Sequence, residues 1–374
     1  MSSGSETSSR IDILRFPLIV GVVFIHNYDT AVHMAQGTIG AAQSSAWVEF
    51  VISFISQGVA RIAVPLFFLM SGYLFFLGEW SWGKYVSKLK RRFHTLLVPL
   101  VFWNALTLLI YAVAQSLPQT KMYFGGNRWP PVYSFSFLNY VNALFGITVT
   151  YPMSYPFWFI RDLIALVILA PVLHFLLAKK TSLAFIVILF CFWCSAVWPV
   201  LWPSVDATFF FSLGAYLSLP GKSVTYLDRL GPWISAVFLG LLILHSAFPE
   251  GPLYLQRAMI VFGVPSLWWL VALAGRIPTL KLWLIRLSGA SFFVFAAQEP
   301  LLSIFRKISY KLLLPTSGSA ILALYFLIPI FLITFLVMVH RFLQSTMPTF
   351  LGVITGSANR PQKQSAKEPV VAQN

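Results

Sequence analysis

The sequence predicts an all-α membrane protein, a polytopic bundle of about ten transmembrane helices with both termini in the cytoplasm. Of the 374 residues, 58% are hydrophobic and only 10% are charged, whereas a soluble domain carries roughly 25% charged residues. The mean hydropathy is +0.79. The hydrophobic residues also gather into runs of about 20, the length that a helix needs to cross a bilayer.

Ten apolar runs account for the predicted spans. They lie at residues 11–28, 48–77, 93–116, 157–178, 182–202, 206–219, 231–248, 258–275, 288–305 and 320–342. Lys and Arg are more frequent in the connections on the side of the N-terminus, and this bias marks the cytoplasmic side. We expect one transmembrane domain over residues 10–345, with disordered cytoplasmic ends at residues 1–9 and 346–374.

Charge and cysteine content exclude several function classes. The formal net charge is +15, but the basic residues are spread between apolar runs, which fits membrane topology and predicts no nucleic-acid partner. Cys191 and Cys194 lie in an apolar run without a second pair, so we interpret them as packing residues. The sequence shows no metal-ligand cluster. Residues 1–9 lack the apolar core of a secretory leader, so the first helix is expected to be retained.

The first predicted helix carries ionisable residues on one face. Arg15 and His26 are eleven residues apart, which is three helical turns and about 16 Å along the axis. Asp12 and Asp29 each lie about one turn from one of them and can pair with it. Charges within a spanning helix usually face the protein interior and mark function. The alternative is that Arg15 reaches the membrane interface and His26 is a structural core residue.

The second predicted helix combines a charge with a helix-breaking residue. Pro65 removes a backbone donor and predicts a kink, beside which we expect Arg61 to point inward. Ser71 and Gly72 favour a close crossing with another helix.

Two later helices also contain acidic or basic residues. Arg161 and Asp162 are adjacent, so their side chains project about 100° apart on a helix. Each is therefore expected to need its own partner within the bundle. Glu299 stands inside the ninth span, next to Pro300.

A basic cluster precedes the third predicted helix, at Lys88, Lys90, Arg91 and Arg92. It is typical of a topology signal, but it could also bind anionic lipid headgroups. A third possibility is that it holds the phosphates of a nucleotide-like donor from the cytoplasm, since arginine matches phosphate oxygens.

An outer segment of about 40 residues, 116–156, is rich in aromatic side chains. They could form either a sugar-stacking surface or an interfacial belt; the residues concerned are Tyr123, Trp129, Tyr133, Phe135, Phe137 and Tyr140.

Several of these segments together resemble the acyltransferase-3 family of integral membrane O-acyltransferases. The resemblance rests on the Arg15–His26 spacing, on the Pro-aromatic-Ser-Gly stretch at residues 63–74 and on the basic entry to the third helix. It also rests on the opening of the fourth helix at residues 158–162, the Phe-rich sixth helix and the Ser-Phe start of the ninth. The similarity covers roughly residues 9–343.

This resemblance implies a ten-helix enzyme of the bacterial inner membrane. Such an enzyme moves an acyl group, usually acetyl from cytoplasmic acetyl-CoA, to a hydroxyl of an extracytoplasmic or lipid-linked glycan, and binds no further cofactor. The resemblance makes His26 the catalytic base and places Arg15 in the donor channel. The family often has two arginines three residues apart before the third helix and a histidine late in the ninth. This chain has Lys88 to Arg92 and Gln298 there instead.

The remaining site residues follow from the chemistry of acyl transfer. A base must reach the acceptor hydroxyl, and a positive group must stabilise the oxyanion. We expect Asp29 to orient the His26 ring. Arg61 or Arg161 could either stabilise the oxyanion or neutralise Asp162. The predicted donor- and substrate-binding residues are Arg15, Asp12, Arg61, Lys88, Arg91, Arg92 and Trp158. Expected partners are membrane lipids, acyl-CoA, the glycan and polysaccharide-assembly machinery.

Two other functions fit inward arginines and an outer aromatic segment. One is a glycan exporter or flippase without acyl-transfer activity, and the other is a structural subunit of a polysaccharide-assembly complex. Succinyl-CoA is an alternative donor.

Overall fold

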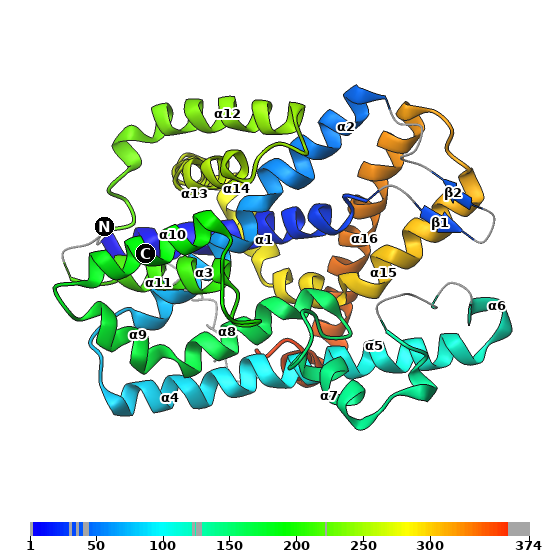
Figure 1. Ribbon diagram of the computed structural model, residues 1–374, viewed down its shortest axis with the longest axis horizontal. Coiled ribbons are helices and arrows are strands. Elements are labelled where there is room, and N and C mark those ends of the chain that lie inside the picture. Colours follow the sequence, from blue (N-terminus) through cyan, green and yellow to red (C-terminus); the bar gives the residue numbers. More distant parts are fainter. Residues whose placement is uncertain are drawn as a thin grey trace, which may run out of the picture.

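The computed structural model describes residues 3–29, 32–34, 37–39, 45–121, 124, 129–220 and 223–357. These residues are predominantly helical (Figure 1). The strands among them are a short antiparallel pair, β1 (Val32–Met34) and β2 (Gly37–Ile39), in which Val32 lies opposite Ile39.

The helices follow one another along the chain with few long connections. In the first half they are α1 (Ser3–His26), α2 (Ala46–Ile52), the π-helical turn η2 (Ser53–Gly58), the 3-10 turn η3 (Val59–Ile62), α3 (Ala63–Phe76), α4 (Trp82–Arg92), the π-helical turn η4 (Phe93–Leu97), α5 (Val98–Ser116), α6 (Pro118–Lys121), η5 (Val132–Ser134), α7 (Phe137–Phe145), η6 (Tyr155–Phe157), α8 (Trp158–Ile168) and α9 (Ala170–Leu177). In the second half they are α10 (Ser182–Ser195), α11 (Val205–Leu217), η7 (Asp228–Leu230), α12 (Gly231–Ala247), α13 (Leu253–Ala274), α14 (Pro278–Ser288), α15 (Ser291–Leu313), α16 (Gly318–Thr346) and α17 (Pro348–Ile354).

Five helical segments of the described chain are long and apolar enough to cross a membrane: Ala46–Phe76, Trp82–Ser116, Asp228–Ala247, Leu253–Ala274 and Gly318–Thr346. Two bent pairs raise this number to seven if each is one span; they are α8 with α9, bent by 61°, and α14 with α15, bent by 60°. The helical membrane architecture is therefore confirmed. The count of ten spans and the location of the termini stay predictions.

Helix α1 lies at the centre of the molecule. Figure 1 shows it crossing the middle of the view, between α12 on one side and α4 with α5 on the other. It contacts α3, α14 and α15, which come from distant parts of the sequence. Apolar residues such as Ile13, Leu14 and Val23 are buried in these contacts. Because α1 is enclosed by protein, it can carry polar side chains that a lipid-facing helix could not.

The second span is irregular before Pro65 rather than at it. It begins as α2, widens into η2, tightens into η3 and becomes a regular α-helix only at Ala63. Pro65 thus lies in the first turn of α3, where a missing backbone donor costs little. The irregularity predicted at Pro65 therefore lies before it in the chain, in the turns η2 and η3.

The ends of the chain also differ from the sequence prediction. Helix α1 begins at Ser3, within the stretch expected to be disordered. At the other end, α17 packs against the bundle, with Leu351 and Ile354 buried. Residues 358–374 of the predicted tail lie outside the described residues.

Helices α3 and α11 cross at very short range. A Cβ atom added to Gly72 would lie 2.0 Å from the carbonyl oxygen of Phe211, and one added to Gly214 would lie 2.0 Å from that of Leu69. Both obstacles are backbone atoms, which cannot rotate away. The tight crossing predicted from Ser71 and Gly72 is therefore confirmed, since small residues let helix backbones approach closely.

We predict that Gly72→Ala destabilises the protein by about 1–3 kcal/mol or more, because the added methyl must push α3 and α11 apart. Thermal unfolding in detergent micelles measures the effect. Gly240→Ala is the matched control, since no atom lies within 4 Å of its added Cβ. An unfolding temperature for Gly72→Ala equal to that of the control would contradict the tight crossing.

Candidate active site

A cavity of about 520 Å³ lies beside α1, within the range of sizes typical of ligand pockets. Its walls come from α1, α3, α4 with η4, α8, α15, α16 and the segment that follows α17. The lining is mainly apolar, with Arg15, His26, Arg91, Arg92 and His340 as its basic or titratable side chains. The fold therefore gathers ionisable residues from three separate helices, α1, α4 and α16, around one space.

One stripe of α1 faces this cavity. The stripe consists of Ile11, Arg15, Ile19, Val22 and His26, which follow the three- and four-residue steps of one helix face. Arg15 and His26 therefore line the same space, three turns apart, as their spacing predicts. Arg15 also pairs with Asp12, with 2.9 Å between Nη1 and Oδ1.

His26 ends α1 and is half-buried at the cavity wall. Its ring packs edge-on against the Tyr155 ring, with 4.8 Å between the centroids. Gln298 approaches the imidazole, but neither atom of its amide is aligned to hydrogen-bond any described residue. The Nδ1 atom of His26 is likewise buried without a hydrogen-bond partner among the described residues.

Asp29 does not supply the orienting bond that the sequence suggested. It lies exposed beyond the end of α1, and its backbone carbonyl oxygen accepts a hydrogen bond of 2.7 Å from Nη1 of Arg306. The chain leaves the helix after His26, so the i+3 geometry on which the prediction rested ends there. Packing against Tyr155 fixes the ring instead.

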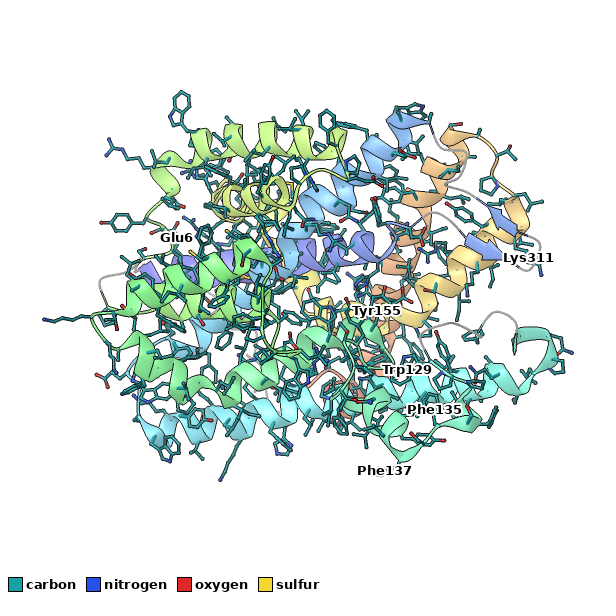
Figure 2. The ribbon with its side chains drawn as sticks, in the orientation of Figure 1. Glu6, Trp129, Phe135, Phe137, Tyr155 and Lys311 are labelled. Carbon is teal, nitrogen blue, oxygen red and sulfur yellow. The ribbon has the colours of Figure 1, made fainter. Side chains whose placement is uncertain are left out.

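Tyr155 connects His26 to a buried carboxylate (Figure 2). The figure labels Tyr155 near the centre of the molecule, and its hydroxyl donates to Oε1 of Glu299 at 3.2 Å. Ser303 donates to the other oxygen, Oε2, at 2.8 Å. Glu299 is buried and interrupts α15 with extended backbone angles. The sequence identified Glu299 as an acidic residue within a predicted span, but no sequence pattern indicated that Tyr155 would connect it to His26.

The basic cluster divides between two tasks. Arg91 and Arg92 line the cavity, together with Thr95 of η4. Lys88 is not among the lining residues; its Nζ donates to the carbonyl oxygen of Phe75 at 2.5 Å, near the C-terminal end of α3. A cation at that end satisfies a free carbonyl and interacts favourably with the helix dipole. Lys88 therefore stabilises the α3–α4 connection in this structure.

Arg161 is buried and fully engaged with the protein. Its Nη1 donates to the carbonyl oxygens of Gly146, Val149 and Thr150, at 2.8, 3.1 and 3.1 Å. Its Nε and Nη2 both donate to Oδ1 of Asp162, at 3.1 and 3.0 Å. The guanidinium therefore holds the loop at residues 146–150 in place and is not among the cavity-lining residues.

The expectation that the Arg161 and Asp162 side chains would point apart was wrong, and Arg161 neutralises Asp162, the alternative that the sequence left open. The arginine side chain is long enough to bend back along α8, so the angle between neighbouring Cβ positions does not keep the two groups apart. Each also has a separate partner, as expected: Asp162 accepts a hydrogen bond of 2.8 Å from the backbone N–H of Ser204.

Arg61 is half-buried and lies in η3, just before α3. Its Nε donates to Oε1 of Gln57 at 2.6 Å, and it is close enough for its charge to act on the His26 imidazole. It is not among the lining residues. Trp158, by contrast, lines the cavity at the start of α8 and packs against Phe68.

Several lining residues were not singled out from the sequence. His340 of α16 lines the cavity, packed against Phe293 with 5.8 Å between the ring centroids. The segment after α17 contributes Thr355, Gly356 and Ser357. Neither His340 nor the segment after α17 lies in a sequence pattern typical of a site, because both reach the cavity only through tertiary packing.

The outer aromatic segment forms its own cluster. Trp129 packs against Phe135 at 5.7 Å, and Phe135 against Tyr140 at 5.3 Å between ring centroids. Figure 2 shows Trp129, Phe135 and Phe137 together beside α5 and α7. None of these side chains lines the cavity. Tyr123 lies outside the described residues.

The arrangement suits a transfer reaction between two ligands. The cavity is lined by arginines suited to an anionic group and by an imidazole suited to proton transfer, and the imidazole lies three turns from Arg15 along α1. In the part of the chain that the structure describes, no three His, Cys, Asp or Glu side chains lie close enough to hold a metal ion.

Known proteins resemble this chain along most of its length. The sequence is 28% identical to the succinoglycan biosynthesis protein ExoH of Rhizobium meliloti over 381 aligned residues, which cover 99% of this chain and 97% of that protein. No solved structure matches the chain. The family described as "Acyltransferase domain", the acyltransferase-3 family, matches residues 8–340. The match covers most of the chain, and the protein therefore belongs to the acyltransferase-3 family of membrane acyltransferases.

Proposed function

We propose that this protein transfers an acyl group from acyl-CoA to a hydroxyl of an extracytoplasmic or lipid-linked glycan, such as an exopolysaccharide or O-antigen. The observation that carries the proposal is the single cavity that holds Arg15, Arg91 and Arg92 together with His26. An enzyme that joins a phosphate-bearing cytoplasmic donor to an acceptor on the other side needs such a continuous path. Family membership supports the reaction class.

The donor would enter at the arginine end of the cavity. Coenzyme A carries several phosphates, and guanidinium groups bind phosphate oxygens through charge-assisted hydrogen bonds. Arg91 and Arg92 lie on consecutive positions of α4 and Arg15 on the facing stripe of α1. The long pantetheine arm would then run along the apolar part of the stripe and bring the thioester toward His26, about 16 Å away along the helix axis.

His26 would act as the general base. It would take the proton from the acceptor hydroxyl while the hydroxyl oxygen attacks the thioester carbonyl. The tetrahedral intermediate would collapse by breaking the carbon–sulfur bond, and the proton on the imidazole would pass to the coenzyme A thiolate. A histidine suits both steps because its ordinary pKa lies near 6.5, and such a positioned base contributes roughly 10²–10⁴-fold to the rate.

The charges around the reacting atoms would have different tasks. Arg61, whose charge acts on the His26 imidazole, is the candidate for stabilising the negative charge that develops on the carbonyl oxygen. Arg161 has its donors on the loop at 146–150 and on Asp162, so we assign it a positioning role. Tyr155 and Glu299 would fix the imidazole in place of the predicted Asp29.

The proposal also covers the acyl donor, the membrane in which the protein lies and its topology. We expect acetyl-CoA as the donor and the bacterial inner membrane as the location, with both termini cytoplasmic. The relative ExoH is named for succinoglycan biosynthesis, which keeps succinyl-CoA as the alternative donor. Comparing the two donors with purified protein decides between them. Polysaccharide-assembly proteins are the expected partners.

A glycan exporter or flippase is the competing function, because inward-facing arginines would also serve a translocation path. Purified protein in lipid vesicles separates the two. An acyltransferase releases free coenzyme A only when donor and glycan are both present. An exporter moves glycan across the vesicle membrane without any acyl-CoA.

We predict that His26→Gln lowers acyl transfer by about 10²–10⁴-fold, because the general base is lost while the side-chain volume is kept. The release of coenzyme A in the presence of acceptor measures this. His174→Gln is the control, since His174 stacks on Trp80 outside the cavity. Near-normal transfer by His26→Gln would remove this residue from the chemistry.

We predict that the double variant Arg91→Gln, Arg92→Gln raises the KM for acyl-CoA by roughly 10- to 100-fold, since a hydrogen bond to a charged group is worth about 1.5–3 kcal/mol. Initial rates over a range of donor concentrations measure the change. Lys84→Gln serves as the control for lost positive charge, because Lys84 is exposed and pairs with Glu79. If both variants raise the KM equally, specific phosphate binding at the cavity is wrong.

We predict that Tyr155→Ala lowers kcat more than Tyr155→Phe does. The phenylalanine keeps the ring that packs on His26 and loses only the hydrogen bond to Glu299. The alanine removes both contacts and frees the imidazole. Turnover at saturating donor gives the comparison, and equal kcat values for the two variants would show that ring packing does not position the base.

A further inference from the structure

Helix α17 and the three residues after it lie beyond the region matched by the acyltransferase family, which ends at residue 340. They are nevertheless fixed to the bundle. The indole Nε1 of Trp103 donates to the carbonyl oxygen of Ile354 at 2.9 Å, and the Ile354 side chain is 2% exposed. Phe350 packs on Phe102 of the same helix, α5, with 5.9 Å between the ring centroids.

The end of α17 has a defined geometry that turns the chain into the cavity. The backbone N–H of Ser357 donates to the carbonyl oxygen of Gly352 at 2.8 Å, and that of Gly356 to Val353 at 3.2 Å. Gly356 has φ of +67°. These are the bonds and the left-handed residue of a Schellman cap. The cap brings Thr355, Gly356 and Ser357 to the cavity wall.

Gly356 rests directly on the backbone of η4. A Cβ atom added to it would lie 2.2 Å from the carbonyl oxygen of Thr95 and 2.7 Å from its Cα. Thr95 belongs to the π-helical turn that begins immediately after Arg91 and Arg92. A π-helical turn is a rare conformation that is found frequently at functional sites. Gly356 therefore contacts the turn that directly follows Arg91 and Arg92, and a shift of this turn would move both arginines.

The segment has no charged side chain between Pro348 and Ser357. It can thus pack beside Arg91 and Arg92 without neutralising them, and it places two neutral hydroxyls, on Thr355 and Ser357, at the same wall. The two hydroxyl oxygens lie 2.8 Å apart.

We propose that the segment Pro348–Ser357 is a positioning element of the donor site, which holds η4 so that Arg91 and Arg92 face the cavity. This inference rests on the proposed function, because it assumes that these arginines bind the phosphates of coenzyme A. It adds to the donor site a part of the chain that the family match does not include. Gly356 is its central residue, since only glycine fits both the positive φ and the contact with Thr95.

The test is the variant Gly356→Ala in the full-length protein. The added methyl must displace either the segment or η4, so we expect coenzyme A to bind at least about tenfold more weakly and the KM for acyl-CoA to rise by a similar factor. The kcat at saturating donor is expected to stay within about twofold, because His26 is not moved. Binding of coenzyme A itself is measured by calorimetry in detergent, and thermal unfolding is measured on the same samples.

Two further variants complete the experiment. Gly83→Ala in α4 is the matched control, because its added Cβ meets no atom within 4 Å, and it should bind coenzyme A as the wild type does. Trp103→Phe removes only the hydrogen bond to Ile354 and should weaken binding in the same direction by a smaller factor. It also serves as the test if Gly356→Ala does not fold.

The possible results separate the two levels of the proposal. Weaker binding in Gly356→Ala and Trp103→Phe, with unchanged kcat, supports the positioning role. Wild-type binding in both variants overturns it and leaves the proposed function intact. A wild-type protein that does not bind coenzyme A overturns the proposed function and this inference together.

Discussion

The structure depends on how a protein keeps charges inside a membrane. An ionised side chain within the bilayer is costly unless it has a partner or faces a polar space, and Arg161 and Arg15 meet that condition in two different ways. Arg161 gives its donors to Asp162 and to three backbone carbonyls. Arg15 pairs with Asp12 and also faces a cavity. The first arrangement makes a charge structural, whereas the second leaves it available to a ligand.

Helical periodicity was enough to predict the central geometry. The step of 3.6 residues per turn places Arg15 and His26 on one face whatever surrounds the helix, and the structure brings both to one cavity. The pairing of Asp12 with Arg15 is equally local. The partners of other charged residues were harder to predict, because they depend on where a helix ends or on how a long side chain folds back. This applies to Asp29, Lys88 and the Arg161–Asp162 pair. His340 and Ser357 reach the cavity, and Tyr155 reaches His26, through packing between distant segments. A single sequence does not encode such packing in any local pattern.

The fold was predictable as a class but not in its detail. Hydropathy identifies apolar runs, and the helical membrane architecture follows from them. It does not say whether a run forms one straight span, a bent pair such as α8 with α9, or a helix interrupted by a π-helical turn. Whether a run stays straight, bends or is interrupted depends on its contacts with neighbouring helices. Gly356 against Thr95 and Gly72 against Phe211 are contacts in which one backbone shapes another.

The stretch between the two ends of the α1 stripe has a bearing on the membrane itself. Ile19 and Val22 separate Arg15 from His26, and the rings of Phe67, Phe159 and Phe295 also line the passage. Apolar walls hold water weakly, and a bare ion that passes between them loses its hydration shell. A neutral thioester arm could thread through the passage, but protons and inorganic ions would face a steep barrier. The protein can therefore enclose a cavity of about 520 Å³ without offering inorganic ions a favourable route along it.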